Sequence, residues 1–111
     1  MSTLNLGVGP VPVEISGEIQ PHRFVGVNNA QAGAGMNTRG VSQTYAKDEA
    51  VAVDILGVVP VEAGAAVTEG ALVETDAQGR AIDQSAGAVV ARAVEGSTGA
   101  GQFVLCQLIP N

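Results

Sequence analysis

The sequence contains very few aromatic residues. It has no Trp, one Tyr (Tyr45) and two Phe (Phe24 and Phe103) among 111 residues. Large aromatic side chains usually contribute much of the energy of a protein core. The other apolar residues are mostly Val and Ala, so a core built from them would be shallow. We expect one domain, because the chain is too short for two typical ones, and we expect it to gain stability from partner chains.

Positive charge is scarce as well. Five Lys and Arg stand against eleven Asp and Glu, for a net charge of −6, and the basic residues do not cluster. Nucleic-acid binding depends on Lys and Arg that neutralise phosphates, so we expect no DNA or RNA partner. The same balance argues against binding to a membrane surface. No apolar run is long enough to span a bilayer, and the N-terminus does not resemble a secretory signal.

Only one cysteine and one histidine are present, and this limits the chemistry available. Cys106 excludes an intrachain disulfide, and its apolar neighbours are typical of a buried, inert thiol. His22 lies in no nucleophile motif. The acidic residues are mostly isolated and do not form the clusters that hold metal ions. We therefore expect no enzyme activity, no catalytic residue, no cofactor and no metal.

The sequence does contain patterns that are typical of β-strands and turns. Apolar residues alternate with other residues at 51–55, and turn signals recur about every 8–12 residues to the end of the chain. A hairpin is expected around "DAQG", with Gly79 left-handed. The last strand is apolar at both odd and even positions, which predicts burial on both faces. We expect an all-β domain over 21–111, a small barrel or sandwich; one or two helical turns at 43–52 are the best candidate for a helix.

The first twenty residues differ from the rest and are expected to form an arm. Gly7, Gly9, Pro10 and Pro12 exclude a helix and a central strand. Val11, Val13 and Ile15 nevertheless alternate with other residues, as in a strand. An extended segment that adds to a sheet edge would have this pattern. An unstructured terminus is the alternative interpretation.

A glycine-rich segment, "GAGMNTRGVS" at 33–42, lies within a predicted long loop at 29–46. It resembles the phosphate-binding loop G-x-x-x-x-G-K-[ST], but Val41 occupies the position of the lysine. That loop also requires a following helix and a parallel sheet, and neither is indicated. The segment is better interpreted as a loop shaped by a protein surface.

Another stretch, "GVVPVEAGAAVTEGALVETD" at 57–76, resembles half of a biotinyl or lipoyl carrier domain. Those domains present a modified lysine at a hairpin tip. The single lysine, Lys47, precedes the stretch, and the tip that follows it reads "DAQGR". A carrier function therefore lacks its essential residue, and an acylated Lys47 would be needed to restore it.

Residues 57–108 resemble more closely the C-terminal part of small phage capsid decoration, or cement, proteins. The matching segments are Ala66 to Val73, Asp76 to Arg80, Gly87 to Ala93 and Ala100 to Leu108. The resemblance covers about half of the chain well and the first 45 residues poorly. It implies a β-tulip-like domain on the outer surface of a phage head, where it would stabilise the expanded shell by clamping neighbouring capsomers. It also implies the major capsid protein as partner, a trimer, and assembly in the host cytoplasm.

Two sets of contact residues follow as expectations. Members of such families pair an N-terminal arm with the capsid, which would here involve the apolar arm residues Leu4, Leu6, Val8, Val11, Val13 and Ile15. Contacts between copies are expected in the long loop, at Met36, Asn37, Arg39 and Tyr45. The alternative is another virion or tail-associated β-module, which the location of the protein in the particle would distinguish.

Overall fold

The fold is that of a computed structural model, which describes residues 10–111. Within these residues the chain forms strands and turns and no helix. The all-β prediction is confirmed. The strands are β1 (Val11–Glu14), β2 (Glu18–Ile19), β3 (Arg23–Gly26), β4 (Thr38–Ser42), β5 (Ala46–Lys47), β6 (Ala50–Asp54), β7 (Val58–Glu62), β8 (Leu72–Thr75), β9 (Ala81–Asp83), β10 (Ala91–Ala93) and β11 (Phe103–Leu108).

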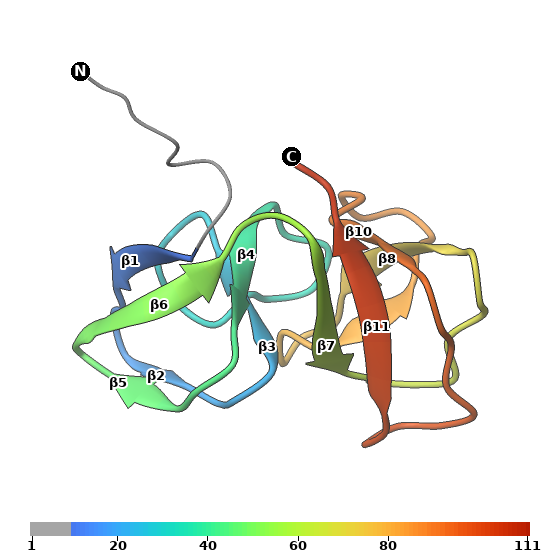
Figure 1. Ribbon diagram of the computed structural model, residues 1–111, viewed down its shortest axis with the longest axis horizontal. Coiled ribbons are helices and arrows are strands. Elements are labelled where there is room, and N and C mark those ends of the chain that lie inside the picture. The colour runs from blue at the N-terminus through green and yellow to red at the C-terminus, as the bar shows by residue number, and fades with distance from the viewer. Residues whose placement is uncertain (1–9) are drawn as a thin grey trace.

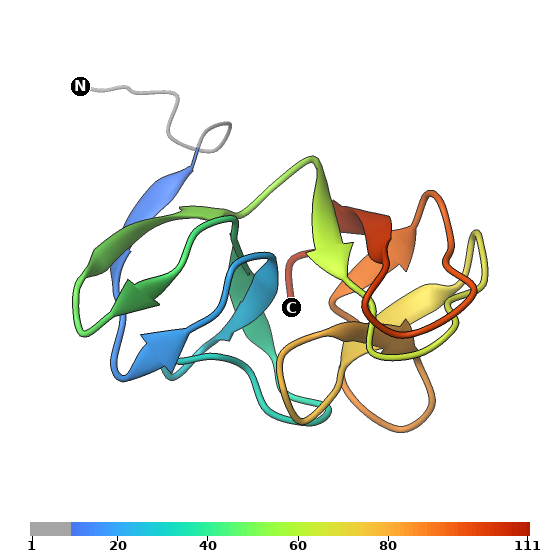
Figure 2. The same ribbon diagram turned by 90° about the horizontal axis from the view of Figure 1, so that it is seen from below.

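The strands divide into two lobes that lie side by side (Figures 1 and 2). The first lobe, residues 10–56, holds an antiparallel sheet in the order β1-β6-β4-β3 and the small pair β2-β5. The second lobe, residues 57–109, holds a five-stranded sheet in the order β7-β11-β10-β8-β9. Ala63, directly after β7, makes a parallel bridge to Ala81 in β9. The two edges of the second sheet thus approach each other.

Two hydrophobic cores hold the lobes together. The smaller core lies inside the first lobe and consists of Ile15, Ile19, Val25, Ala46 and Val53. The main core fills the second lobe and also includes Phe24 and Val41 from the first. Neighbouring side chains of β3 therefore enter different cores, Phe24 the main one and Val25 the smaller one. This strand is buried on both faces because it forms the wall between the lobes.

The last strand, β11, was predicted to be buried on both faces, and only one of its faces is. Val104 and Cys106 are buried, as expected for one face of β11, but Phe103 on the other face is 57 % exposed. That face is only partly covered: Val58 and Gln107 are exposed as well, whereas Glu62 beside Phe103 contacts Arg23 of β3. The two-sided burial predicted for β11 is found in β3 instead.

The short helix considered for residues 43–52 is also corrected. This stretch forms β5, a turn at Asp48 with φ of 50°, and β6. Strand β6 pairs with β1 on one side and β4 on the other. These long-range pairs override the local helical preference of the "AKDEAVA" sequence. By contrast, the β8–β9 hairpin forms as predicted, with Gly79 left-handed at φ of 73°.

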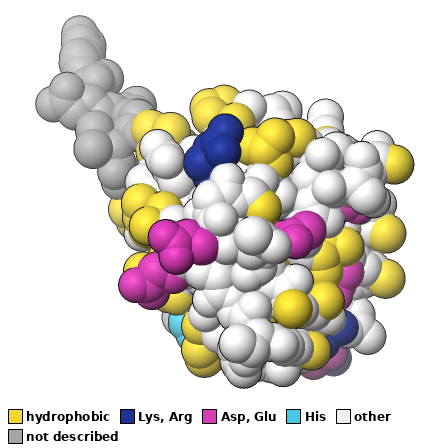
Figure 3. Space-filling model, turned by 90° about the vertical axis from the view of Figure 1, so that its right-hand side faces the viewer, with side chains coloured by type: hydrophobic (Ala, Val, Ile, Leu, Met, Phe, Trp, Pro, Cys, Tyr) yellow, Lys and Arg dark blue, Asp and Glu magenta, His cyan; other side chains and the backbone are white. Residues whose placement is uncertain are grey.

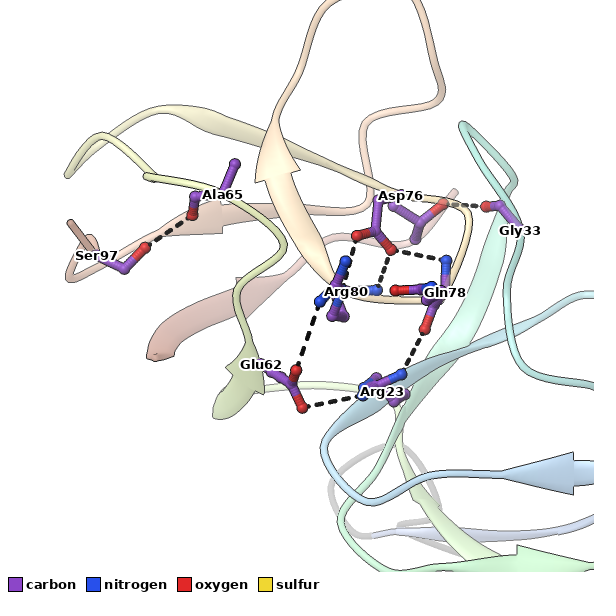
Figure 4. A network of polar contacts seen from close by, with 9 residues as sticks. Arg23, Gly33, Glu62, Ala65, Asp76, Gln78, Arg80 and Ser97 are labelled. Carbon is purple, nitrogen blue, oxygen red and sulfur yellow. Dashed lines mark hydrogen bonds and ion pairs between the residues drawn. The ribbon is translucent and has the colours of Figure 1, made fainter. Parts of the chain in front are cut away.

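A polar network joins the lobes at their boundary. Glu62 of β7 lies between Arg23 of β3, at 3.0 Å, and Arg80 of the β8–β9 hairpin, at 3.8 Å (Figure 4). Arg80 also pairs with Asp76 at 2.9 Å. Arg23 additionally donates to the backbone carbonyl of Gln78. The backbone N–H of Phe24 donates to the carbonyl of Gly79 at 2.8 Å. Strand β3 and this hairpin are thereby fixed to each other.

Candidate functional site

The arm expected at residues 1–20 is part of the folded domain from Val11 onward. Strand β1 pairs with β6 along its whole length, from Val11 opposite Val53 to Glu14 opposite Ala50. The strand-like alternation was predicted correctly, but the sheet it joins is in its own chain. Leu4, Leu6 and Val8 lie outside the described residues.

Ile15, one of the expected capsid contacts, is buried within the chain. Its side chain is 3 % exposed and belongs to the smaller core. Its backbone N–H donates to the carbonyl of Glu49 at 2.9 Å. Ile15 therefore contributes to the stability of the first lobe. Val13 and Val11, two and four positions earlier in the same alternation, are half-buried.

The free edge of β1 is poorly suited to accept another strand. In an antiparallel ladder, alternate residues direct their N–H and C=O groups toward the partner strand. The bond from Ile15 to Glu49 places the odd-numbered residues of β1 on the inward side. The outward positions are then Pro10, Pro12 and Glu14, and proline has no N–H to donate. Prolines of this kind protect sheet edges from unwanted pairing.

The predicted loop at 29–46 is shorter than expected because β4 begins at Thr38. Its glycine-rich part turns back onto the second lobe. The N–H of Gly35 donates to the carbonyl of Thr75 at 2.9 Å, and the hydroxyl of Thr75 donates to the carbonyl of Gly33 at 2.5 Å. Val41, at the position of the phosphate-loop lysine, is fully buried. The surface that this loop contacts is therefore its own chain.

The four loop residues expected at contacts between copies have different environments. Met36 is half-buried and packs against the main core of its own chain. Asn37 and Arg39 are exposed, and the guanidinium of Arg39 donates to the carbonyl of Val27 and to the side chain of Asn29. These two residues remain available at the surface.

Tyr45, the fourth of these residues, is 49 % exposed and lies directly before β5. Its hydroxyl donates to the carboxylate of Glu18 at 2.5 Å. This hydrogen bond, together with the negative charges of Glu18, Glu49 and Asp48, raises the pKa of Tyr45. The phenol therefore stays protonated, and its hydrogen bond to Glu18 fixes its position among acidic side chains. Tyr45 likewise remains available for an intermolecular contact.

An apolar groove of about 470 Å³ lies on the described surface. Residues of β1 and β4 and residues that follow β3 and β6 line it, and residues 110–111 form its far side. Its lining residues are Val11, Val13, Val27, Thr38, Arg39, Ile55, Leu56, Pro110 and Asn111. The groove contains three residues expected at contacts, Val11, Val13 and Arg39. Sequence analysis missed Ile55 and Leu56, whose role depends on the pairing of β6 with β1.

The C-terminus forms one end of this groove. The side-chain carbonyl of Asn111 accepts a hydrogen bond from the N–H of Thr38 at 2.7 Å. In both ribbon views the C-terminus lies between the two lobes (Figures 1 and 2). Arg39 supplies the only positive charge among the lining residues. The site is therefore suited to bind apolar side chains and offers no arrangement for chemistry.

A second apolar surface lies on the outer face of β7 and β11. Val58 is 51 % exposed and Phe103 57 %. The ring of Phe103 meets the ring of His22 edge-on, with the centroids 4.8 Å apart. At the second-lobe end of the molecule, hydrophobic side chains form small separate groups with acidic and basic side chains among them (Figure 3). Exposed aromatic residues are enriched at protein interfaces, so this face is a further candidate contact.

The side chains that could take part in chemistry or be modified are Cys106, Glu74 and Lys47, and each is placed by the fold. Cys106 is buried, and burial raises the pKa of its thiol to about 12. Glu74 is buried and accepts hydrogen bonds from the N–H groups of Ser85 and Gly87, which lower the pKa of its carboxyl. Lys47 lies in β5 of the first lobe, and the hairpin tip at 76–80 is docked against β3.

The same part of the chain lacks the features of two other kinds of site. Residues 10–111 contain no group of three His, Cys, Asp or Glu side chains placed to hold a metal ion. A helix long and apolar enough to cross a membrane is not found among them either.

Comparison with known proteins agrees with this architecture. The solved structure of the N-terminal base of head fibre protein gp8.5 of bacteriophage phi29 is similar, with a TM-score of 0.73. The two sequences are 17 % identical, and the similarity covers 90 % of this chain and 92 % of the phage chain. At this identity the likeness shows a shared fold. No curated protein sequence matches the chain.

A family match gives the identity of the chain more directly. The sequence model of the phage cement protein family matches residues 8–108. The match includes both lobes, the glycine-rich loop and the groove residues up to Leu56, and so extends over the first half of the chain, where motifs alone were weak. A structural role in a phage head follows from it. The chain belongs to the phage cement protein family.

Proposed function

We propose that this protein binds the outer surface of a phage capsid and stabilises the expanded head by clamping neighbouring capsomers. Membership of the cement family supports this role. The observation that carries it is the open apolar groove at the end of the first lobe, next to the N-terminal segment. A groove lined by exposed aliphatic side chains is a typical protein contact site. Leu4, Leu6, Val8, Val11 and Val13 would supply the shell contact there.

Clamping needs at least two contact surfaces on one rigid body. The groove lies on the first lobe, and the exposed face around Phe103 and Val58 lies on the second. The network around Glu62 fixes the lobes to each other. Binding of one rigid unit to two shell subunits would resist their separation. We propose that Phe103 contacts either a second capsomer or another copy in a trimer, with Asn37, Arg39 and Tyr45 as further contacts between copies.

Mass action explains how such binding would stabilise a head without chemistry. A ligand that binds only the expanded shell stabilises that state by RT ln(1 + [L]/Kd) at each site. The effect is repeated over every site of the shell. The acidic charge of the protein keeps free copies apart and soluble. The proposal therefore predicts that bound heads withstand heat better than bare heads.

The test uses expanded heads that lack the protein. Purified protein is added, bound copies are counted after sedimentation, and DNA release is followed on heating. Leu56→Ser, in the groove, should weaken binding by about tenfold, because it removes part of the buried area of one leucine. A variant that binds with unchanged affinity would contradict the groove as the shell contact.

Val58→Ser tests the other proposed contact face, because Val58 is exposed to a similar degree and lies outside the groove. Its effect separates the two proposed contact faces. Electron microscopy of decorated particles then distinguishes the outer head surface from a tail location. Mass measurement of the free protein in solution tests the trimer. Absence of the protein from the head surface would overturn the proposed function itself.

A further inference from the structure

The groove is the open end of the smaller core. On β1, Val11 and Val13 lie on the same face as buried Ile15, because they are separated by two residues. Ile55, which directly follows β6, continues the face of buried Val53 for the same reason. The register places Val11 opposite Val53 and Val13 opposite Val51. One continuous apolar face therefore begins in the core and ends in the groove.

The side chains at that open end are apolar but only partly covered. Val13 and Ile55 are half-buried and pack against the smaller core, and Leu56 is 43 % exposed. The alternate positions on the opposite face, such as Pro12 and Ala52, face solvent as expected for the outside of a sheet. The first lobe thus has a core that lacks cover at one end. An additional apolar segment would complete it.

The chain itself supplies a segment of the right chemistry at the right place. Residues 1–9, "MSTLNLGVG", end one residue before Val11, which lines the groove. Leu4, Leu6 and Val8 alternate with small or polar residues, and the segment carries no charged side chain. Nine residues reach about 30 Å when extended, which is ample to cross the groove. Gly7 and Gly9 permit the change of direction that crossing requires.

We propose that residues 2–8 of the same chain lie in this groove in the free protein, with Leu4 and Leu6 completing the smaller core. Attachment beside the groove gives this segment an effective concentration in the millimolar range. A second copy would have to overcome the mutual repulsion of two chains of charge −6. The inference concerns the free protein and goes beyond the proposed function. On a head, the same segment and groove would exchange this contact for shell contacts.

The experiment measures where the N-terminal segment lies in solution. Ser2→Cys carries a nitroxide spin label, and wild-type protein treated with the same reagent controls for Cys106. We expect the amide NMR signals of Ile55, Leu56 and Asn111 to broaden in the labelled protein. Those of Phe103 and its neighbours, which lie outside the groove, should stay sharp. Unchanged signals for the groove residues would overturn the proposal.

Two further samples separate seating in the groove from mere attachment nearby. In the labelled protein with Leu4→Ser and Leu6→Ser, the broadening at Ile55 and Leu56 should fall. The matched control Thr3→Ser and Asn5→Ser, at the alternate positions, should keep it. A loss of broadening in both pairs, or in neither, would contradict side-chain seating.

A mixture of isotope-labelled protein without the spin label and spin-labelled protein without isotope tests the identity of the occupant. Sharp signals in the mixture are expected, because the segment belongs to the same chain. Broadening of Ile55 and Leu56 in the mixture would show that the groove takes the segment of a second copy and would overturn the proposal. None of these outcomes depends on capsid binding, so they are distinct from a failure of the proposed function.

Discussion

Gly35 and Gly87 bring two loops into backbone contact at the boundary between the lobes. A Cβ atom on Gly87 would lie 2.5 Å from the Cα atom of Gly35 and 2.9 Å from a carboxylate oxygen of Glu74. The N–H of Ala88 donates to the carbonyl of Gly35 at 3.2 Å. The glycine-rich loop therefore contacts the second lobe through its backbone, at a distance that only glycine permits.

This contact predicts that Gly87→Ala destabilises the protein. The added methyl group meets backbone on one side and a hydrogen-bonded carboxylate on the other, and neither can move freely. We expect a loss of about 1–3 kcal/mol in the free energy of unfolding, the usual range for an overpacked site. Gly99→Ala is the control, because its Cβ would have nothing within 4 Å. Equal stability of the two variants in urea unfolding would contradict the close contact.

Glu74 predicts a specific dependence of stability on pH. The N–H groups of Ser85, at 2.6 Å, and Gly87, at 3.0 Å, donate to its carboxylate and hold its pKa below the usual value. A lowered folded-state pKa stabilises the protein above the unfolded-state pKa, and this contribution is lost as the pH falls through the folded-state value.

Substitution of Glu74 tests this sign. Glu74→Gln should cost about 1–3 kcal/mol at neutral pH, because the N–H groups of Ser85 and Gly87 lose a charged acceptor. The variant should also lose less stability than the wild type on acidification toward pH 3. Thermal unfolding at several pH values measures both effects, with exposed Glu69→Gln as control. A parallel decline of variant and wild type in acid would remove Glu74 as the cause.

The network at the lobe boundary predicts a salt-dependent contribution. Glu62→Gln leaves Arg23 and Arg80 without their shared carboxylate, whose side chain is 24 % exposed. We expect a loss of roughly 1 kcal/mol at low ionic strength, and a smaller one in 1 M salt because partly exposed charges are screened. Urea unfolding of both proteins in the two salts measures this difference. A loss that is the same in both salts would indicate that packing, not charge, is responsible.

Cys106 predicts a thiol that reacts only when the fold opens. Burial raises its pKa to about 12, so the thiolate is scarce at pH 8 and the sulfur is inaccessible. Alkylation followed by mass spectrometry should be slow in native protein and rapid in urea. The native rate should increase in Gly87→Ala, because a less stable fold opens more often. Rapid modification of stable native protein would contradict the burial of β11.

Features that depend only on residues close together in the sequence could be predicted from it. The alternation at 51–55 and the β8–β9 hairpin are both local patterns, and each is found in the structure. In such places the residue type and the backbone geometry are directly linked.

Features that depend on distant pairing could not be predicted in this way. Nothing in the sequence around Met36 indicates that it packs against the main core of the second lobe. The apolar residues of β11 could not show that one of its faces is only partly covered, since that depends on what packs above it. The groove combines residues of β1 and β4 with residues that follow β3 and β6 and with residues 110–111, so no single segment carries its pattern.

The hydrogen bond between Thr38 and Asn111 has a consequence for how the chain folds. It joins residues 73 positions apart, and β1 pairs with a strand some 40 residues later. Such non-local contacts make folding slow, because long loops must close before their contacts form. The first lobe also shares Phe24 and Val41 with the core of the second. We therefore expect both lobes to melt in a single cooperative transition.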